Sequence, residues 1–267
     1  MTDGDAPSVY LEQVRRDLTR YGMDERTPAQ WPLRRRLLLK AFNTLHPMLM
    51  RTSPFGQRKR DLGLVWPPNA ETMIGMQRLT SLQRCVETVL TDDIPGDLIE
   101  CGVWRGGACI LMRAVLAAYA DETRCVWLAD SFEGLPRPDT ANYTADKWMR
   151  GDLLSGILAV SETEVRANFQ RYGLLDDQVR FLPGWFKDTL HDAPIDRIAL
   201  LRLDGDLYES TIQALDALYP RLSPGGFCII DDYQILACRK AVTDYRAKHE
   251  VTAEIVDIDG SAVLWRK

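Results

Sequence analysis

Carboxylates stand at the ends of several short apolar runs in this sequence. Three of them, Asp204, Asp231 and Asp232, would repel one another strongly if they met without a cation between them. They offer oxygen ligands with no neighbouring His or Cys, which favours Mg²⁺ and leaves Ca²⁺ or Mn²⁺ as alternatives. Such an ion orients a hydroxyl group and lowers its pKa, and Asp206 is then the candidate base for the hydroxyl proton. Helix capping is the competing explanation for Asp206 or Asp232 singly, but it explains the whole set poorly.

The stretch 97–107 (DLIECGVWRGG) predicts a site for a small ligand. An apolar strand delivers Glu100, turns at Gly102 and leads through Gly106 into a helix. A dinucleotide site needs a second glycine where Trp104 stands, so a pyrophosphate is disfavoured. An acid followed by glycines suits a ligand with a cationic end, such as S-adenosylmethionine (SAM). A turn that binds no ligand is the alternative.

Asp130 follows the next apolar run directly. An acid at this position of a nucleotide-binding half accepts hydrogen bonds from the two ribose hydroxyls of an adenosine. The competing role is that of a cap for the turn that follows.

Apolar runs alternate with amphipathic segments, which predicts a mostly parallel α/β sheet. Ligands of an open parallel sheet bind outside the carboxyl ends of its strands, so the acids should converge on one crevice. A hairpin with a two-residue turn at Asp259-Gly260 is expected to add an antiparallel edge. The expected strands are 97–101, 124–129, 178–182, 197–203, 227–230, 252–258 and 261–265, and the expected helices are 71–90, 109–119, 161–172, 209–219 and 237–248.

Two segments fall outside this alternation. Residues 1–70, with helices expected at 9–21 and 33–50 and an irregular stretch at 55–69, are predicted to form a helical cap before a catalytic domain at 71–267. These helices lack a core of their own, so they should pack on the main domain or on a second subunit of a homodimer or larger homo-oligomer. Residues 135–155 form a long polar loop, typical of a functional lid or a disordered segment.

The composition limits the classes of partner and the kinds of site that the protein is expected to have. The formal net charge of -5 disfavours nucleic acid and anionic membranes, and no apolar run approaches the length of a membrane span. Residues 1–7 are polar and acidic, unlike a secretory signal. The six cysteines form no Cys-x-x-Cys pair, which is typical of reduced thiols in a cytoplasmic protein. Only three histidines are present, which weakens any zinc site.

Longer motifs add a resemblance to a known family. The chain from about residue 71 onward resembles the macrocin O-methyltransferases, which are metal-dependent sugar O-methyltransferases of natural-product biosynthesis. The motifs that carry this resemblance are 100–107 (ECGVWRGG), 129–136 (ADSFEGLP), 184–190 (GWFKDTL), 203–211 (LDGDLYEST) and 225–233 (GGFCIIDDY). The resemblance implies a Rossmann-like class I SAM-dependent methyltransferase fold. It also implies Mg²⁺-dependent methylation of a deoxysugar hydroxyl on a glycosylated small molecule.

The resemblance also implies roles for individual residues. Asp204, Asp231 and Asp232 would hold Mg²⁺, and Asp206 would be the general base. The residues implied at the SAM site, with the first two near its methionine end, are Thr72, Met73, Glu100, Gly102, Val103, Trp104, Arg105, Gly106, Asp130, Ser131, Phe132 and Trp185.

The acceptor is the least determined part of the prediction, because the sugar rests on the resemblance alone. A catechol or a nucleotide sugar would present similar hydroxyls, and a nicotinamide-dependent oxidoreductase is a more distant alternative. A non-catalytic relative would be expected to lose some of the four aspartates, and all four are present. Acceptor choice is expected to lie in the least family-like parts, the segment before residue 71 and the loop 142–155.

Overall fold

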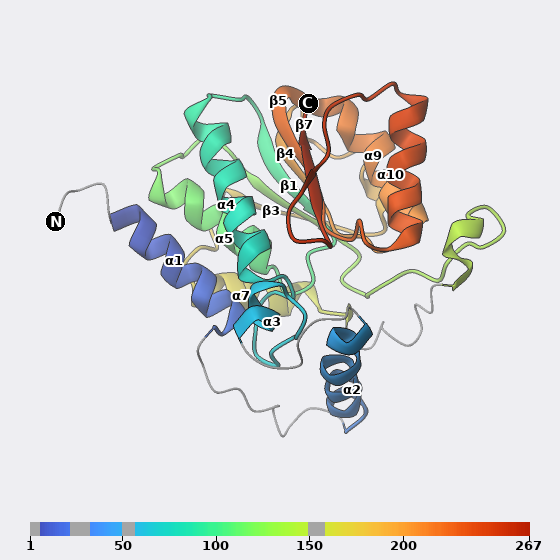
Figure 1. Ribbon diagram of the computed structural model, residues 1–267. Helices are drawn as coiled ribbons and strands as arrows, with labels where there is room; N and C mark the ends of the chain where they lie inside the picture. Colours follow the sequence, from blue (N-terminus) through green and yellow to red (C-terminus); the bar gives the residue numbers. More distant parts are fainter. Residues whose placement is uncertain (1–5, 22–32, 50–56, 149–157) are drawn as a thin grey trace.

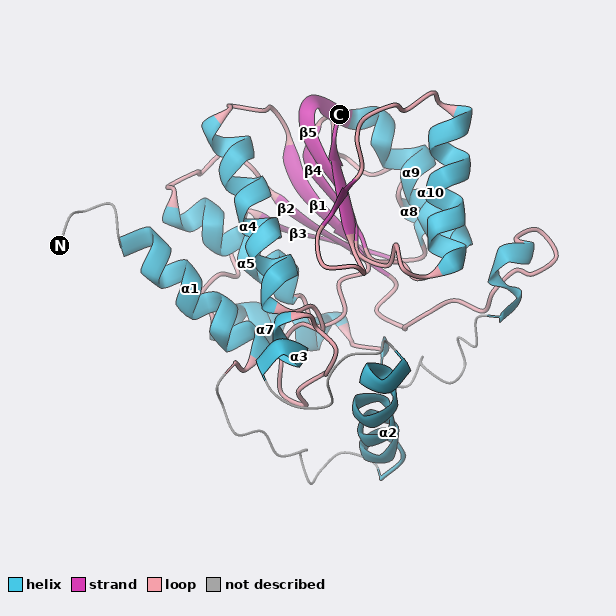
Figure 2. Ribbon diagram, in the orientation of Figure 1, coloured by secondary structure: helices cyan, strands magenta, loops and turns pink. Residues whose placement is uncertain are grey.

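A twisted sheet with helices on both faces forms the centre of the molecule (Figure 1, Figure 2). The computed structural model describes residues 6–21, 33–49, 57–148 and 158–267. The seven strands lie in the order β3-β2-β1-β4-β5-β7-β6, and the first five are parallel. The last two add the antiparallel edge, which confirms the predicted α/β class. The strands are β1 (Asp97–Cys101), β2 (Val126–Asp130), β3 (Val179–Pro183), β4 (Ile198–Leu203), β5 (Leu222–Ile230), β6 (Val256–Asp257) and β7 (Val263–Arg266).

The alternation of side chains along each strand divides the apolar residues between two cores. Leu98 and Leu200 are paired in register and face one core, while Ile99 and Leu201 face the other. Every residue of β4 is buried. Burial on both faces explains why the central strands read as continuous apolar runs in the sequence.

Two helix layers cover the sheet (Figure 1). One layer holds α1 (Ala6–Thr19), α4 (Met76–Thr91), α5 (Gly107–Ala118) and α7 (Glu162–Arg171), and the other holds α8 (Phe186–Thr189), α9 (Tyr208–Leu218) and α10 (Leu236–Lys248). Ser161 begins α7 as predicted, because its hydroxyl accepts a hydrogen bond from the backbone N–H of Glu164 at 3.2 Å. No helix within the described ranges is both long and apolar enough to cross a bilayer.

The N-terminal segment contributes to the main core. Leu11, Val14 and Leu18 of α1 are buried in the same cluster as α4 and α5. Next come α2 (Leu33–Leu49) and α3 (Gln57–Asp61). The stretch 55–69 was predicted to be irregular, and the helix α3 within it corrects that prediction. Its charged sequence QRKRD has no apolar periodicity from which a helix could be predicted. The division at residue 70 remains a prediction.

The helix predicted over 71–90 begins five residues late, at Met76. Gly75 precedes it in an extended conformation, and a Cβ atom there would lie 2.2 Å from the carbonyl oxygen of Asp61. The Thr72 hydroxyl accepts a hydrogen bond from the Ile74 backbone N–H at 3.3 Å, which stabilises a turn. Thr72 and Met73 therefore lie on a loop and not on a helix.

The C-terminal hairpin also differs from its prediction. Its last backbone hydrogen bond joins Ile258 N–H to the Ala262 carbonyl, which leaves three residues in the turn. The Asp259 carboxylate accepts hydrogen bonds from the backbone N–H groups of Ser261 and Ala262, and Gly260 has a φ of +85°. A single left-handed glycine suits this longer turn, whereas the two-residue turn needs positive φ at both positions.

Candidate active site

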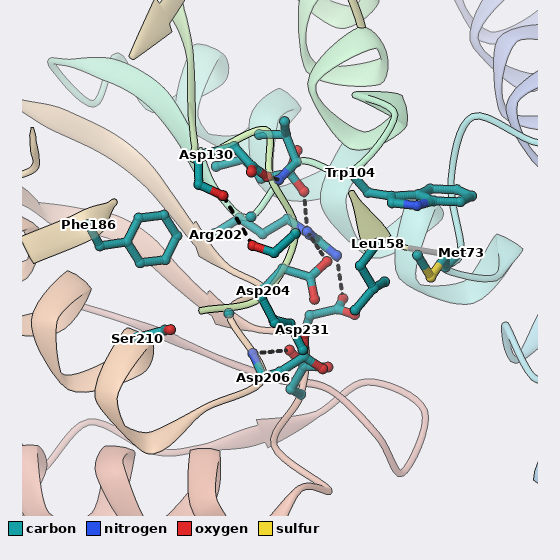
Figure 3. A pocket seen from close by; sticks show the side chains of 18 of the residues that line it. Met73, Trp104, Asp130, Leu158, Phe186, Arg202, Asp204, Asp206, Ser210 and Asp231 are labelled. Carbon is teal, nitrogen blue, oxygen red and sulfur yellow. Dashed lines mark hydrogen bonds and ion pairs between the residues drawn. The ribbon is translucent and has the colours of Figure 1, made fainter. Parts of the chain in front are cut away.

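A cavity of about 610 Å³ opens at the carboxyl ends of the central strands. The sheet order reverses between β1 and β4, which is where an open α/β sheet binds its ligands. Six strand-end acids from separate parts of the sequence line this one cavity, as the pattern of strands predicts: Glu100, Asp130, Asp204, Asp206, Asp231 and Asp232. In Figure 3, Trp104 and Met73 lie together on one side of the acids, and Phe186 and Ser210 lie on the other.

Close packing of the strand ends brings the acids together. Beyond the strands, the backbone N–H of Asp204 donates to the Cys101 carbonyl, and that of Asp231 donates to the Leu203 carbonyl, both at 2.9 Å. Gly102 has a φ of +89°, and a Cβ atom there would lie 2.0 Å from the carbonyl oxygen of Asp204. Glycine is thus required at this position for both its conformation and its lack of a side chain.

Asp204, Asp231 and Asp232 form a compact set of oxygen ligands. One carboxylate oxygen from each lies within 4.8 Å of the other two. All three line the cavity, so a bound ion would be accessible to a ligand there. Hard carboxylate oxygens without sulfur or imidazole match the preference of Mg²⁺. The residues present therefore fit a divalent ion of this kind.

Two arginines that the sequence reasoning overlooked lie among these acids. Arg202 is fully buried and contacts three of them: it binds Asp231 at 2.5 Å, Asp204 at 2.9 Å, and Glu100 (Figure 3). Arg78 binds the other oxygen of Asp231 at 2.5 Å. A cation was expected among these acids and was assigned to a metal, whereas these two guanidinium groups supply part of the positive charge. Arg202 could have been noticed in the sequence, because it is a charged residue inside the apolar run of β4. The pattern of α4 gives no comparable indication for Arg78.

The acids still outnumber the cations. Ten acidic residues line the cavity, among them Glu100, Asp204, Asp206, Asp231 and Asp232, against four basic ones, Arg78, Arg137, Lys187 and Arg202. Burial raises the pKa of Glu100 to about 7 against the opposing charge of Arg202. Burial and the neighbouring carboxylates of Asp206 and Asp204 raise the pKa of Asp232 well above its usual range. This residual negative charge favours a further cation.

Asp206 occupies an unusual backbone conformation at the edge of this set. Its φ is +57°, in the left-handed region that non-glycine residues seldom adopt. Its backbone N–H donates to the carboxylate of Asp232 at 3.0 Å. Burial, followed by the charges of Asp204 and Asp231, raises the pKa of Asp206 to about 7. A carboxylate with such a pKa is a better proton acceptor near neutral pH than an ordinary aspartate.

Asp130 lies at the end of the cavity away from Asp206 (Figure 3). It caps the neighbouring turns, which is the alternative role considered for it from the sequence. Its two oxygens accept hydrogen bonds from the backbone N–H groups of Val103 and Phe132, each at 2.7 Å. Burial raises the pKa of Asp130, while these backbone donors oppose that shift. Each carboxylate oxygen has a second lone pair, so capping is compatible with binding a ribose hydroxyl.

Most of the other residues predicted at the cofactor site also line the cavity: Thr72, Met73, Glu100, Gly102, Val103, Trp104, Ser131 and Trp185. Trp104 has a φ of +46°, and the Arg105 guanidinium lies 4.4 Å from its ring.

Arg105, Gly106 and Phe132 are not among the lining residues. Arg105 points away to donate to the carbonyls of Pro68 and Ala70, both at 2.8 Å. Gly106 precedes α5 with a φ of +84°, and a Cβ there would lie 2.8 Å from Val165. The Phe132 ring packs near that of Phe181, with centroids 6.1 Å apart. Each supports the turns around the cavity.

Several other lining residues escaped the sequence reasoning. Glu71 lines the cavity and accepts hydrogen bonds from Arg171 at 2.7 Å and Tyr172 at 3.1 Å, which ties the 71–75 loop to α7. Further polar residues also line the cavity, including Glu209, Ser210, Gln213 and Gln234. Glu209 and Ser210 lie in the motif 203–211, which could have indicated them, whereas Gln213 and Gln234 lie outside the motifs.

Comparison with known proteins shows which family the chain belongs to. The sequence model of the family described as Macrocin-O-methyltransferase (TylF) matches residues 7–267. The chain belongs to the macrocin O-methyltransferase family. The predicted family and the predicted enzyme class, an O-methyltransferase, are thereby confirmed.

Two curated relatives are similar over most of their length. The 8-demethyl-8-(2,3-dimethoxy-alpha-L-rhamnosyl)-tetracenomycin-C 4'-O-methyltransferase of Streptomyces olivaceus is 61% identical over 78% of this chain and 79% of its own. Mycinamicin III 3''-O-methyltransferase of Micromonospora griseorubida is 52% identical over 82% of this chain and 87% of its own.

Solved structures agree on the fold. The O-methyltransferase NovP is 48% identical with a TM-score of 0.77, over 87% of this chain and 99% of its own. The calicheamicin methyltransferase CalS11, at 20% identity and a TM-score of 0.58, covers 92% of this chain and 97% of its own, and it shares the fold.

Proposed function

We propose that this enzyme transfers the methyl group of SAM to a sugar hydroxyl of a glycosylated natural product, with the help of Mg²⁺. The observation that carries the proposal is the meeting of Asp204, Asp231 and Asp232 in the cavity that also receives Asp130 and the glycine turn after β1. The names of two relatives, at 61% and 52% identity, specify methylation of a rhamnosyl tetracenomycin and of mycinamicin III, which supports a glycosylated acceptor here.

We assign SAM to the side of the cavity that Trp104 and Met73 line (Figure 3). Asp130 accepts hydrogen bonds from the ribose hydroxyls beside those that it receives from backbone N–H groups. Thr72 and Met73 lie near the methionine end on the loop before α4. Glu100 contributes mainly by holding Arg202, since that ion pair already engages one of its oxygens.

Asp204, Asp231 and Asp232 would hold the Mg²⁺ ion, and Arg202 and Arg78 orient two of these carboxylates, those of Asp204 and Asp231. A divalent ion at this position supplies Lewis-acid activation, because it lowers the pKa of a bound hydroxyl group and orients it.

Asp206 is the proposed general base. It accepts the proton of the acceptor hydroxyl while that oxygen forms a bond to the methyl carbon and the carbon–sulfur bond breaks. The products are a methyl ether, S-adenosylhomocysteine and protonated Asp206. Burial is the largest cause of the raised pKa of Asp206, and it makes this carboxylate a better proton acceptor than an ordinary aspartate. Catalysis then depends mainly on holding the hydroxyl, the methyl group and the base in line.

Mass spectrometry of methyl transfer across a panel of acceptors tests this function. The panel contains glycosylated macrolides, aminocoumarins and aromatic polyketides, a nucleotide sugar and a simple catechol, each with SAM, with and without Mg²⁺. We expect a mass gain of one methyl group on a glycosylated scaffold. Transfer only to the catechol or to the nucleotide sugar would move the substrate assignment to that class, and no transfer to any acceptor would contradict the proposal.

A further inference from the structure

Asp146 caps a helix that lies far from it in the sequence. Its side chain is fully buried, and its two oxygens accept hydrogen bonds from the backbone N–H groups of Tyr208 at 2.7 Å and Glu209 at 3.0 Å. These N–H groups open α9, whose own N-cap residue, Leu207, has no side chain able to accept a hydrogen bond. Asp146 thus supplies the missing cap from another segment of the chain.

The capped turn carries functional residues of the proposed site. It directly follows Asp206, whose left-handed φ of +57° must be maintained by its surroundings. On one side Asp206 is held by its backbone hydrogen bond to Asp232. On the other side it continues through Leu207 into the turn that Asp146 holds, from which Glu209 and Ser210 line the cavity.

The same segment also forms part of the cavity wall. Leu135, Arg137 and Asp139 line the cavity, and the Tyr143 backbone N–H donates to the Asp139 carbonyl at 2.8 Å. The short helix η1 (Thr144–Trp148) follows and brings Asp146 to α9. The Tyr143 ring packs near that of Tyr208, with centroids 5.9 Å apart. Residues 135–148 therefore run without a break from the wall of the cavity to the start of α9. The predicted lid 135–155 includes this segment, and its residues 149–155 lie outside the described part of the chain.

We propose that Asp146 is a positioning residue that fixes Asp206 and the acceptor-facing turn of α9. This inference rests on the proposed function, in which Asp206 is the base. A charged carboxylate that accepts two N–H groups makes stronger hydrogen bonds than a neutral cap. Loss of these bonds would let the first turn of α9 shift. A displacement of about 1 Å in a catalytic base or in a substrate contact can lower the rate by about 100-fold.

The test compares Asp146→Ala with Ser161→Ala, which removes an ordinary N-cap from α7. Hydrogen exchange of the peptide 206–212 reports the cap directly, and we expect faster exchange in Asp146→Ala alone. Turnover per folded molecule should fall about 10- to 100-fold in kcat/KM for the acceptor. The Kd for SAM should not change, because the cofactor side of the cavity is untouched. Ser161→Ala should keep wild-type values in all three measurements.

Asp146→Asn provides a second variant of the same size, in case the alanine variant fails to fold. It keeps one acceptor oxygen but turns an amide donor toward the second N–H group, so an intermediate loss of kcat/KM is expected. Unchanged exchange of the peptide 206–212, or a kcat/KM equal to that of Ser161→Ala, would overturn the inference. Wild-type turnover on a glycosylated acceptor tests the proposed function separately, because the inference concerns only the ratio of variant to control.

Discussion

Asp206 and Asp204 lie two positions apart, yet they are proposed to act differently, as base and as metal ligand. The difference arises from their surroundings. Arg202 binds Asp204 directly at 2.9 Å and opposes the rise in the pKa of that carboxyl, whereas burial and the charges of Asp204 and Asp231 together raise the pKa of Asp206 to about 7. A group with an environment of this kind is suited to proton transfer rather than to permanent charge pairing.

Asp206→Asn should therefore lower kcat by about 10²- to 10⁴-fold, the usual contribution of a general base. Affinity for Mg²⁺ should change little, because Asp206 is not among the three clustered ligands. Steady-state kinetics together with calorimetric titration of Mg²⁺ gives both quantities. A near-normal kcat would remove Asp206 from the role of base.

Arg202 has a structural task that a metal does not replace. It contacts three acids, two of them buried, so Arg202→Ala should leave the buried Glu100 without its cation, weaken the pairing of Asp231 and Asp204, and lower the free energy of unfolding by about 3–5 kcal/mol. Urea unfolding without added divalent ions measures the loss.

The matched control is Lys240→Ala, which breaks the exposed pair with Asp244 and should cost only about 0.3–0.5 kcal/mol. Equal losses in the two variants would show that the buried network contributes no more to stability than a surface pair.

At the scale of elements, the sheet was predictable and several boundaries were not. Buried parallel strands leave an unmistakable apolar run, and the acids follow those runs directly, so the position of Asp231 could be inferred from the chain alone. The start of α4 at Met76 could not, because it depends on the fit of Gly75 against Asp61. Arg78 escaped for the same reason, since its contact with Asp231 spans 153 positions.

Gly102 determines how closely β1 and β4 approach at the site. Gly102→Ala should destabilise the protein for two reasons. Alanine disfavours the left-handed φ of +89°, and its Cβ atom would clash with the Asp204 carbonyl. Only the first reason applies to Gly173→Ala, because a Cβ there meets nothing within 4 Å.

We expect a loss of about 1–2 kcal/mol for Gly173→Ala and a further loss of about 1–3 kcal/mol for Gly102→Ala. Thermal unfolding of both variants separates the two penalties. If Gly102→Ala is no less stable than Gly173→Ala, the close approach of the strand ends is not a constraint.

At the scale of the whole molecule, α2 leaves an apolar row exposed. Leu33, Leu37 and Leu45 are exposed at spacings of four and eight, which places them on one face of the helix. We predict a homodimer or a larger homo-oligomer in which this face is covered. Light scattering coupled to size-exclusion chromatography should give at least twice the mass of one chain. A monomer across the micromolar range would contradict this prediction.

The central claim is that the three clustered aspartates hold a divalent ion that methyl transfer requires. The most direct measurement is methyl transfer to a glycosylated acceptor after treatment with EDTA and again after Mg²⁺ is restored, with Asp231→Asn as the matched variant. We expect EDTA to stop the wild-type reaction and Mg²⁺ to restore it. The variant should stay inactive at all Mg²⁺ concentrations but still bind SAM. Full wild-type activity in excess EDTA would contradict the claim.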